Sequence, residues 1–214
     1  CVTQHGEQAG NIAKTSALFA GWPDSVSGLT VHRFCSSSID AIALAGLKVA
    51  TGHSEAIVAG GVEMMSRVPM LSDAARVFSD PAYAVQHQML LMGSGADLIA
   101  TRIGASREDC DAVALQSQQR AALAQQEGRF QSIIPVETPE GVISEDECIR
   151  ADMTAERLAK LPAAFAELGA AGADQVQLQK FPALRAIEHV HTMGNSPAMC
   201  DDGALVLLGG EALG

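Results

Sequence analysis

The sequence predicts an α/β protein, because its first part alternates strand and helix and its composition suits that class. A strand is predicted over residues 28–34, a helix over 36–50 and a second, buried strand over 55–59. Two successive strands joined by a helix favour a parallel sheet with a right-handed crossover. Hydrophobic residues make up 48% of the chain but aromatic residues only 4%, so Ala, Val, Ile, Leu and Met must build the core.

The other elements follow in chain order. Residues 11–20 are predicted to form a helix that ends at Gly21-Trp22-Pro23. The helix over 36–50 is apolar on nearly every face, so we expect it to lie between layers of the protein. Residues 63–92 are irregular and 163–186 are low in complexity. The remaining predicted elements are a helix over 93–103, a helix from the capping box at Ser106 to about Glu127, a strand over 133–136, a short helix over 154–161 and strands over 189–192 and 204–208.

Charge and cysteine content exclude several classes of protein. The formal net charge is −11 and no Lys/Arg cluster offsets it, which argues against binding to nucleic acid or to an anionic membrane. We recognise no signal peptide and no apolar run long enough to span a bilayer. The five cysteines are odd in number and form no Cys-x-x-Cys pair, which argues against a disulfide framework or a structural zinc site. A reducing, cytoplasmic compartment is expected. Because the chain begins at Cys1, inside what resembles a strand end, we expect a fragment.

Cys35 is the candidate nucleophile. It lies at the predicted turn between the strand over 28–34 and the helix over 36–50, and three serines follow it. Backbone N–H groups and the positive end of the helix dipole favour a thiolate at such a place, and a thiolate is a strong nucleophile. A buried structural cysteine is the alternative, since that is the commonest fate of an unpaired thiol. The local pattern leaves both interpretations open.

Several segments, in order and in register, resemble the thiolase family. The segments are Val-His-Arg-Phe-Cys-Ser-Ser-Ser over 31–38, Gly-Gly-Val-Glu-Met-Met-Ser-Arg-Val-Pro over 60–69, two stretches within 92–100 and 106–121, and His-Thr-Met-Gly-Asn-Ser over 191–196. They are similar to the family's nucleophile motif, its Gly-Gly-x-Glu-x-Met-Ser-x-x-Pro motif, the segments after it, and its Thr-Ala-Gly-Asn-x-Ser element. The nearest group is that of acetyl-CoA acetyltransferases and 3-ketoacyl-CoA thiolases.

The resemblance implies a layered α/β/α/β/α fold made of two similar halves. Residues 1–214 would be an incomplete N-terminal domain, and residues from about 63 to 190 would contain the inserted loop and CoA-binding subdomain. The implied activity is thiolytic cleavage of 3-ketoacyl-CoA, or the reverse Claisen condensation, through an acyl-cysteine at Cys35. The implied context is fatty-acid β-oxidation in a homodimer or homotetramer. CoA and acyl-CoA would be substrates and partners, with no permanently bound cofactor.

The resemblance also implies roles for four further residues. Arg150 occupies the position of an arginine that lies against the CoA adenine, although a solvated surface charge is the alternative. Met92 matches a methionine of the acyl and pantetheine channel, or it is a loop-core methionine. Ser196 lies near a serine that bonds the pantetheine, but the matching position is Pro197, which has neither hydroxyl nor N–H. Gly194 is expected to allow a tight turn or a close backbone approach.

The sequence leaves two alternative sites open. It also departs from the family pattern at His32, where asparagine is usual, at Pro197, and at two positions where glycine is usual. His189 and His191 alternate as a metal pair could, but no third ligand is evident. The segment Gly93-Ser94-Gly95 is an incomplete dinucleotide-binding pattern. Ser38 and Asp202 stand where the family usually has glycine, so Ser38 is expected to crowd the turn and Asp202 adds a charge.

Rival functions also follow from the sequence. A decarboxylating condensing enzyme of the ketoacyl-synthase type is one, and a non-catalytic thiolase-like binding or assembly subunit is the other. The 214 residues contain none of the family's C-terminal motifs, which are Asn-Glu-Ala-Phe, a Gly-His-Pro histidine and a second acid/base cysteine. We therefore expect no turnover from this chain alone.

Overall fold

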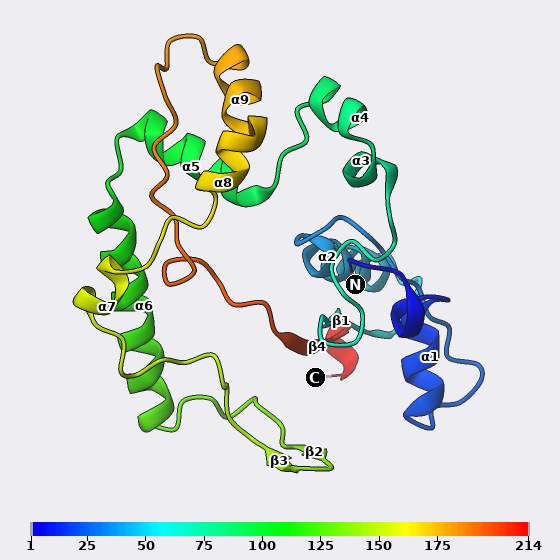
Figure 1. The fold of residues 1–214 in the computed structure, drawn as a ribbon. Helices are drawn as coiled ribbons and strands as arrows, with labels where there is room; N and C mark the ends of the chain where they lie inside the picture. The colour runs from blue at the N-terminus through cyan, green and yellow to red at the C-terminus, as the bar shows by residue number, and fades with distance from the viewer. Residues whose placement is uncertain (1, 214) are drawn as a thin grey trace. The chain divides into compact units, whose positions relative to one another are not determined.

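The computed structural model describes residues 2–213, which form two compact units. The first unit comprises Cys1–Ser79 and Met199–Gly214, and the second is Asp80–Ala198. The first unit contains η1 (Gly6–Gln8), α1 (Ile12–Phe19), α2 (Ser37–Ala50), β1 (Ala56–Met64), α3 (Arg76–Ser79), β4 (Asp201–Gly209) and η3 (Glu211–Leu213), as labelled in Figure 1. The second contains α4 (Pro81–Gln86), α5 (Met92–Ile103), α6 (Arg107–Gln126), β2 (Val136–Thr138), β3 (Gly141–Ile143), α7 (Ala155–Ala159), α8 (Ala166–Leu168), the π-helical η2 (Gly169–Ala173) and α9 (Asp174–Lys180).

The sheet of the first unit is an antiparallel pair of strands. β1 and β4 run in register from Ala56 opposite Gly209 to Met64 opposite Asp201. The predicted parallel sheet is therefore wrong for the described residues. The expected strand over 28–34 forms no ladder with any described segment, and a strand without a partner cannot satisfy its backbone. The partner of β1 is β4 instead, which follows the second unit in the sequence.

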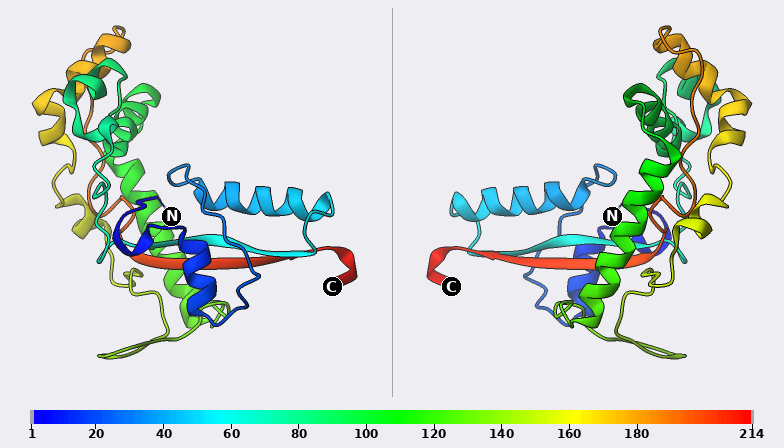
Figure 2. Two further views of the ribbon diagram at one scale, coloured as in Figure 1. Left: turned by 90° about the vertical axis from the view of Figure 1, so that its right-hand side faces the viewer. Right: turned by 90° about the vertical axis from the view of Figure 1, so that its left-hand side faces the viewer.

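Helix α2 covers one face of this strand pair (Figure 2). Side chains alternate between faces along a strand, and the face that carries Gly61 is the one that α2 contacts, through Ser38. Ala45 in the middle of the helix is 2% exposed. On the opposite side of α2, Ile39 and Leu47 are 65% and 64% exposed. The helix is thus covered on one side by described residues, whereas its sequence predicts burial on nearly all sides.

The second unit is built on the long helix α6, whose start is the predicted capping box. The Ser106 hydroxyl accepts from the Asp109 N–H at 3.1 Å, and the Asp109 carboxylate accepts from the Ser106 N–H at 2.9 Å. Arg107 joins α6 to the chain near α7, because its guanidinium donates to the Leu158 and Leu161 carbonyls. The capping box that the sequence predicts therefore forms the start of α6.

Two predicted strands of this part of the chain differ in the structure. Residues 189–192 form no strand in the described chain; hydrogen bonds to side chains hold their backbone N–H groups instead. The strand expected over 133–136 is β2, at Val136–Thr138, which pairs with β3 in a short hairpin. No helix among the described residues is long and apolar enough to cross a membrane.

Candidate functional site

Cys35 lies in a tight turn, residues 33–37, that we call the Cys35 turn. Phe34, directly before it, has a φ of 47°, in the left-handed region. Backbone bonds of 3.0 Å join the Ser36 N–H to the Arg33 carbonyl and the Ser37 N–H to the Phe34 carbonyl. Helix α2 begins two residues after Cys35, with Ser36 as its N-cap. The Cys35 side chain is exposed, so the interpretation as a buried structural cysteine is wrong.

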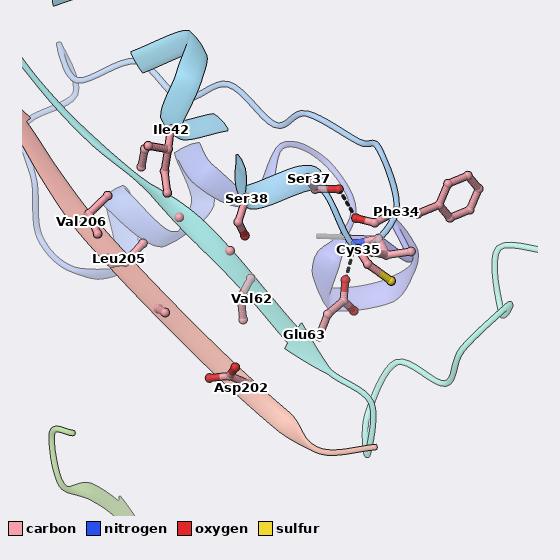
Figure 3. Close-up of a pocket in the computed structure, with 15 residues that line it drawn as sticks. Phe34, Cys35, Ser37, Ser38, Ile42, Val62, Glu63, Asp202, Leu205 and Val206 are labelled. Atoms are coloured by element: carbon pink, nitrogen blue, oxygen red, sulfur yellow. Dashed lines mark hydrogen bonds between the residues drawn. The ribbon is translucent and has the colours of Figure 1, made fainter. Parts of the chain in front are cut away.

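A pocket of about 260 Å³ opens beside this thiol (Figure 3). Its walls come from the Cys35 turn, the first turns of α2, β1 and β4, all within the first unit. The lining residues are Val2, Phe34, Cys35, Ser37, Ser38, Ile42, Ala59, Gly60, Gly61, Val62, Glu63, Asp202, Ala204, Leu205 and Val206. Most of them are apolar or small, and the titratable groups among them are Cys35, Glu63 and Asp202. The pocket can therefore receive an uncharged group next to a thiol.

Glu63 anchors the start of the chain beside this pocket. Its carboxylate accepts hydrogen bonds from the Val2 N–H and, at 3.1 Å, from Gln8 Nε2. The amide of Gln8, which is only 2% exposed, also accepts from the Met64 N–H at 2.8 Å and donates to the Thr3 carbonyl at 2.9 Å. Both carboxylate oxygens of Glu63 are thus engaged by the protein, which gives this residue a structural role.

The other predicted site residues belong to the second unit. Met92 is the first residue of α5 and its side chain is 73% exposed. Arg150 lies in a loop, where its N–H donates to Gln118 Oε1 at 2.6 Å and its side chain is exposed. Gly93, next to Met92, is packed by Phe165, because a Cβ at Gly93 would lie 2.0 Å from that ring.

Gly194 and Ser196 lie in the loop that follows His191. The Gly194 N–H donates to the Thr192 hydroxyl at 3.2 Å, and a Cβ on Gly194 would lie 2.4 Å from Leu161 and 2.6 Å from Leu158. Glycine is therefore required there for close approach, as the sequence predicts. Ser196 is half-buried, and the following Pro197 is exposed.

A buried carboxylate organises this loop, and the sequence does not indicate that it bonds the two histidines. Asp97 is fully buried and accepts from His191 Nδ1 at 2.7 Å, from His189 Nδ1 at 2.8 Å and from the N–H groups of Val190 and His191. His189 Nε2 bonds Asp174 at 3.1 Å. Burial of the imidazole lowers the pKa of His189, but hydrogen bonds and charges of the two carboxylates outweigh it, so the pKa is raised.

The two histidines thus have a described partner other than a metal. Among the described residues, no group of three or more His, Cys, Asp or Glu side chains could hold a metal ion. His189 and His191, two positions apart in the sequence, both bond the same carboxylate, that of Asp97. Asp97 and His191 lie in segments that resemble the family, whereas His189 lies outside them, and no local pattern connects the carboxylate with the two histidines.

The arrangement of the chain is that of the thiolases. It superposes on the crystal structure of human mitochondrial 3-ketoacyl-CoA thiolase in complex with CoA with a TM-score of 0.77 and 27% identity, over 99% of this chain and 52% of that one. Residues 1–177 match the family described as thiolase, N-terminal domain. The chain therefore belongs to the thiolase family, and its fold is the predicted α/β thiolase-like fold.

Proteins with similar sequences are named as thiolases that act on different acyl-CoA molecules. The 3-ketoacyl-CoA thiolase of Bacillus subtilis (strain 168) is 34% identical over 97% of this chain and 52% of its own length. The 3-oxoadipyl-CoA/3-oxo-5,6-dehydrosuberyl-CoA thiolase of Escherichia coli (strain K12) is 34% identical over 100% and 54%. The β-ketoadipyl-CoA thiolase of Pseudomonas knackmussii is 39% identical over 75% and 45%. The chain spans about half the length of these relatives.

Proposed function

We propose that Cys35 is the acyl-carrying nucleophile of an acyl-CoA thiolase. The observation that carries the proposal is an exposed thiol at the N-terminal turn of α2, open to a mostly apolar pocket, in a chain of the thiolase family. The N–H groups of the first helical turn and the helix dipole stabilise a thiolate at this place. The same N–H groups can donate to an oxyanion that forms on an attacked carbonyl.

The proposed reaction is thiolysis of a 3-ketoacyl-CoA. The Cys35 thiolate attacks the C3 carbonyl, the C2–C3 bond breaks, and the enolate of the released acetyl-CoA takes up a proton. The acyl-cysteine is then attacked by the thiol of free CoA, which gives the shortened acyl-CoA and restores Cys35. Condensation of two acyl-CoA molecules is the same sequence reversed. The names of the relatives support 3-ketoacyl thioesters as the substrate class.

The remaining assignments are part of the same proposal. Met92, Arg150, Gly194 and Ser196 are proposed to contact the acyl and CoA groups, with CoA as substrate rather than resident cofactor. Degradation of fatty acids in the cytoplasm by a homo-oligomer is the proposed setting. The family assignment supports these roles for positions that match its motifs, whereas Asp202 and Ser38 depart from them.

The test is acyl transfer from acetyl-CoA to Cys35, in which the thiolate displaces CoA and no carbon–carbon bond must break. Peptide mass spectrometry of the chain after incubation should find the acetyl group on Cys35 and none in Cys35→Ser. Cys200→Ser is the matched control, because Cys200 is also exposed but lies outside the pocket. An acetyl group spread equally over both cysteines, or found on neither, would contradict the proposal and favour the non-catalytic binding role.

A further inference from the structure

We propose that Ser37 is a positioning residue for the Cys35 thiol, because its hydroxyl holds the turn from which the thiol projects. This inference rests on the proposed function, in which Cys35 acts as nucleophile. Ser37 is the first residue of α2 and is 6% exposed. Its side chain is thus largely buried, although the residue also contributes to the lining of the Cys35 pocket.

The hydroxyl of Ser37 bonds the backbone of the two residues that precede Cys35. It donates to the Phe34 carbonyl at 2.6 Å and accepts from the Arg33 N–H at 2.9 Å; the first of these bonds is drawn in Figure 3. One short side chain therefore connects the first turn of α2 with the segment that leads into the nucleophile. Cys35 lies inside the loop that these two bonds close.

The backbone conformation that these bonds hold is unfavourable by itself. Phe34 has a φ of 47°, and a bulky residue in the left-handed region suffers a clash between its Cβ and the backbone. Such a conformation persists where surrounding contacts fix it. Loss of the Ser37 hydroxyl removes the partner of the Arg33 N–H and one of the bonds to the Phe34 carbonyl. The turn then relaxes, and the thiol is no longer held in its present place.

Ser36 provides a matched comparison within the same turn. It is the N-cap of α2, where a serine commonly bonds a backbone N–H of the first helical turn, but its hydroxyl makes no capping bond here. The structure thus has two adjacent serines of which the second, already inside the helix, clamps the turn. A general effect of removing a hydroxyl near Cys35 would appear equally at both positions.

The test is the rate of Cys35 alkylation by iodoacetamide at neutral pH, followed on the Cys35 peptide by mass spectrometry. Ser37→Ala should slow alkylation about tenfold, the scale of one lost hydrogen bond. Ser36→Ala should stay within about twofold of the starting protein, since no capping bond is lost. Equal rates for Ser37→Ala and the unchanged protein would overturn the assignment.

A second pair of variants tests the same role if Ser37→Ala fails to fold. Ser37→Thr keeps the hydroxyl and Ser37→Val has nearly the same shape without it. Circular dichroism checks both for the native helix content. We expect Thr to retain the alkylation rate more fully than Val, and equal rates for the two would contradict the role of the hydroxyl.

Phe34→Gly separates positioning from simple stability. Glycine adopts a positive φ without strain, so a turn with glycine in place of Phe34 depends less on the clamp. The slowing caused by Ser37→Ala should therefore be several-fold smaller in the Phe34→Gly background than in the unchanged chain. An undiminished effect would show that Ser37 does not act through the conformation of Phe34.

The outcome is independent of the acyl-transfer test. Alkylation measures the thiol and not its substrate, so Ser37 dependence without an acetyl group on Cys35 would retain the positioning role and reject the thiolase activity. An acetyl group on Cys35 with no Ser37 dependence would do the opposite. The thiol of Cys110 competes little for iodoacetamide at neutral pH, because burial and the charges of Asp109 and Asp111 raise its pKa.

Discussion

The Ser38 hydroxyl lies directly over Gly61, so that a Cβ on Gly61 would stand 2.2 Å from Ser38 Oγ. Ser38 occupies a position where the family usually has glycine, and it was expected to crowd the turn. It fits because β1 carries a glycine at the contact point. The serine on α2 and the glycine on β1 are therefore complementary in size where the two elements pack. Both residues line the pocket that contains Cys35.

This contact predicts that Gly61→Ala has opposite effects in two backgrounds. In the unchanged chain the new methyl group forces Ser38 out of its rotamer, so the free energy of unfolding should fall by about 1 kcal/mol, at the lower end for overpacking. In the Ser38→Gly background the same substitution should be neutral or stabilising, because alanine loses less backbone entropy in a strand. Urea denaturation of the four proteins gives the coupling free energy.

Gly60→Ala is the control for that cycle. A Cβ on Gly60 would lie 1.9 Å from the Ala204 carbonyl oxygen, a backbone atom that Ser38→Gly does not move. It should therefore destabilise both backgrounds alike. If Gly61→Ala also costs the same in both, Ser38 and Gly61 are not coupled and the account of this departure from the family pattern is wrong.

The second departure, Asp202, should lower stability slightly. Asp202 on β4 stands directly opposite Glu63 on β1, and like charges at directly paired positions are destabilising. Asp202→Asn should raise the free energy of unfolding by about 0.2–1 kcal/mol at neutral pH, and the gain should shrink in high salt. Urea denaturation at two salt concentrations measures both.

Asp201→Asn, one residue earlier, should act in the other direction. Asp201 accepts from the Ser66 hydroxyl at 2.5 Å and from the Ser66 N–H at 2.9 Å, and these bonds hold its pKa below the usual range. Stability from Asp201 is thus present above its ordinary pKa and lost as the pH falls through the lowered one. Destabilisation by both substitutions would argue against repulsion between Asp202 and Glu63.

Helices α1, α2, α5, α6 and α7 were predictable because their signals are local, whereas α3, α4 and the helices from Ala166 to Lys180 lie in segments expected to be irregular or low in complexity. The capping box of Ser106 and Asp109 and the apolar run from Ser37 lie within the elements that they start. The sheet was not predictable, because β1 pairs with β4 and all the residues between Met64 and Asp201 separate the two strands. The expected strand over 28–34 has the right composition but no partner among described residues, and pairing rather than propensity decides a strand.

In the candidate site, too, the features that depend on adjacent residues were predictable and those that depend on distant residues were not. The placement of Cys35 at a helix start depends on adjacent residues and was predicted from them. The role of Asp97 depends on His189 and His191, which are more than ninety positions away, and no local pattern connects them. The Ser37 clamp is local, but a run of three serines does not indicate which of them turns inward.

The Asp97–His189–Asp174 cluster predicts a dependence of stability on pH. Because the pKa of His189 is raised above its usual 6.5, the stability that it contributes is complete below that value and is lost as the pH rises through the raised pKa. His189→Gln should therefore destabilise the protein more at about pH 5.5 than at about pH 8.5. Urea denaturation at both pH values, with the exposed His53→Gln as control, measures the difference.

An equal loss at both pH values would mean that His189 is neutral throughout and that the carboxylates do not favour its charged form. Hydrogen exchange at the amides of Val190 and His191 is a local measurement of the same cluster. Both N–H groups donate to Asp97, so they should exchange faster in His189→Gln if loss of the imidazole loosens this carboxylate.

The isolated chain should accept an acyl group but should not turn over. The lining of the Cys35 pocket contains the carboxylates Glu63 and Asp202 but, among the described residues, no imidazole or second thiol that could move a proton at the substrate. Both oxygens of Glu63 are already bonded to Val2 and Gln8, so it is poorly placed to act as a base. Carbon–carbon cleavage needs such a group, whereas exchange of a thioester with Cys35 does not. We therefore expect an acetyl-cysteine from acetyl-CoA, and thiolysis of acetoacetyl-CoA at the rate of the Cys35→Ser control. Thiolysis above that control would show that groups within these residues supply the missing proton transfers.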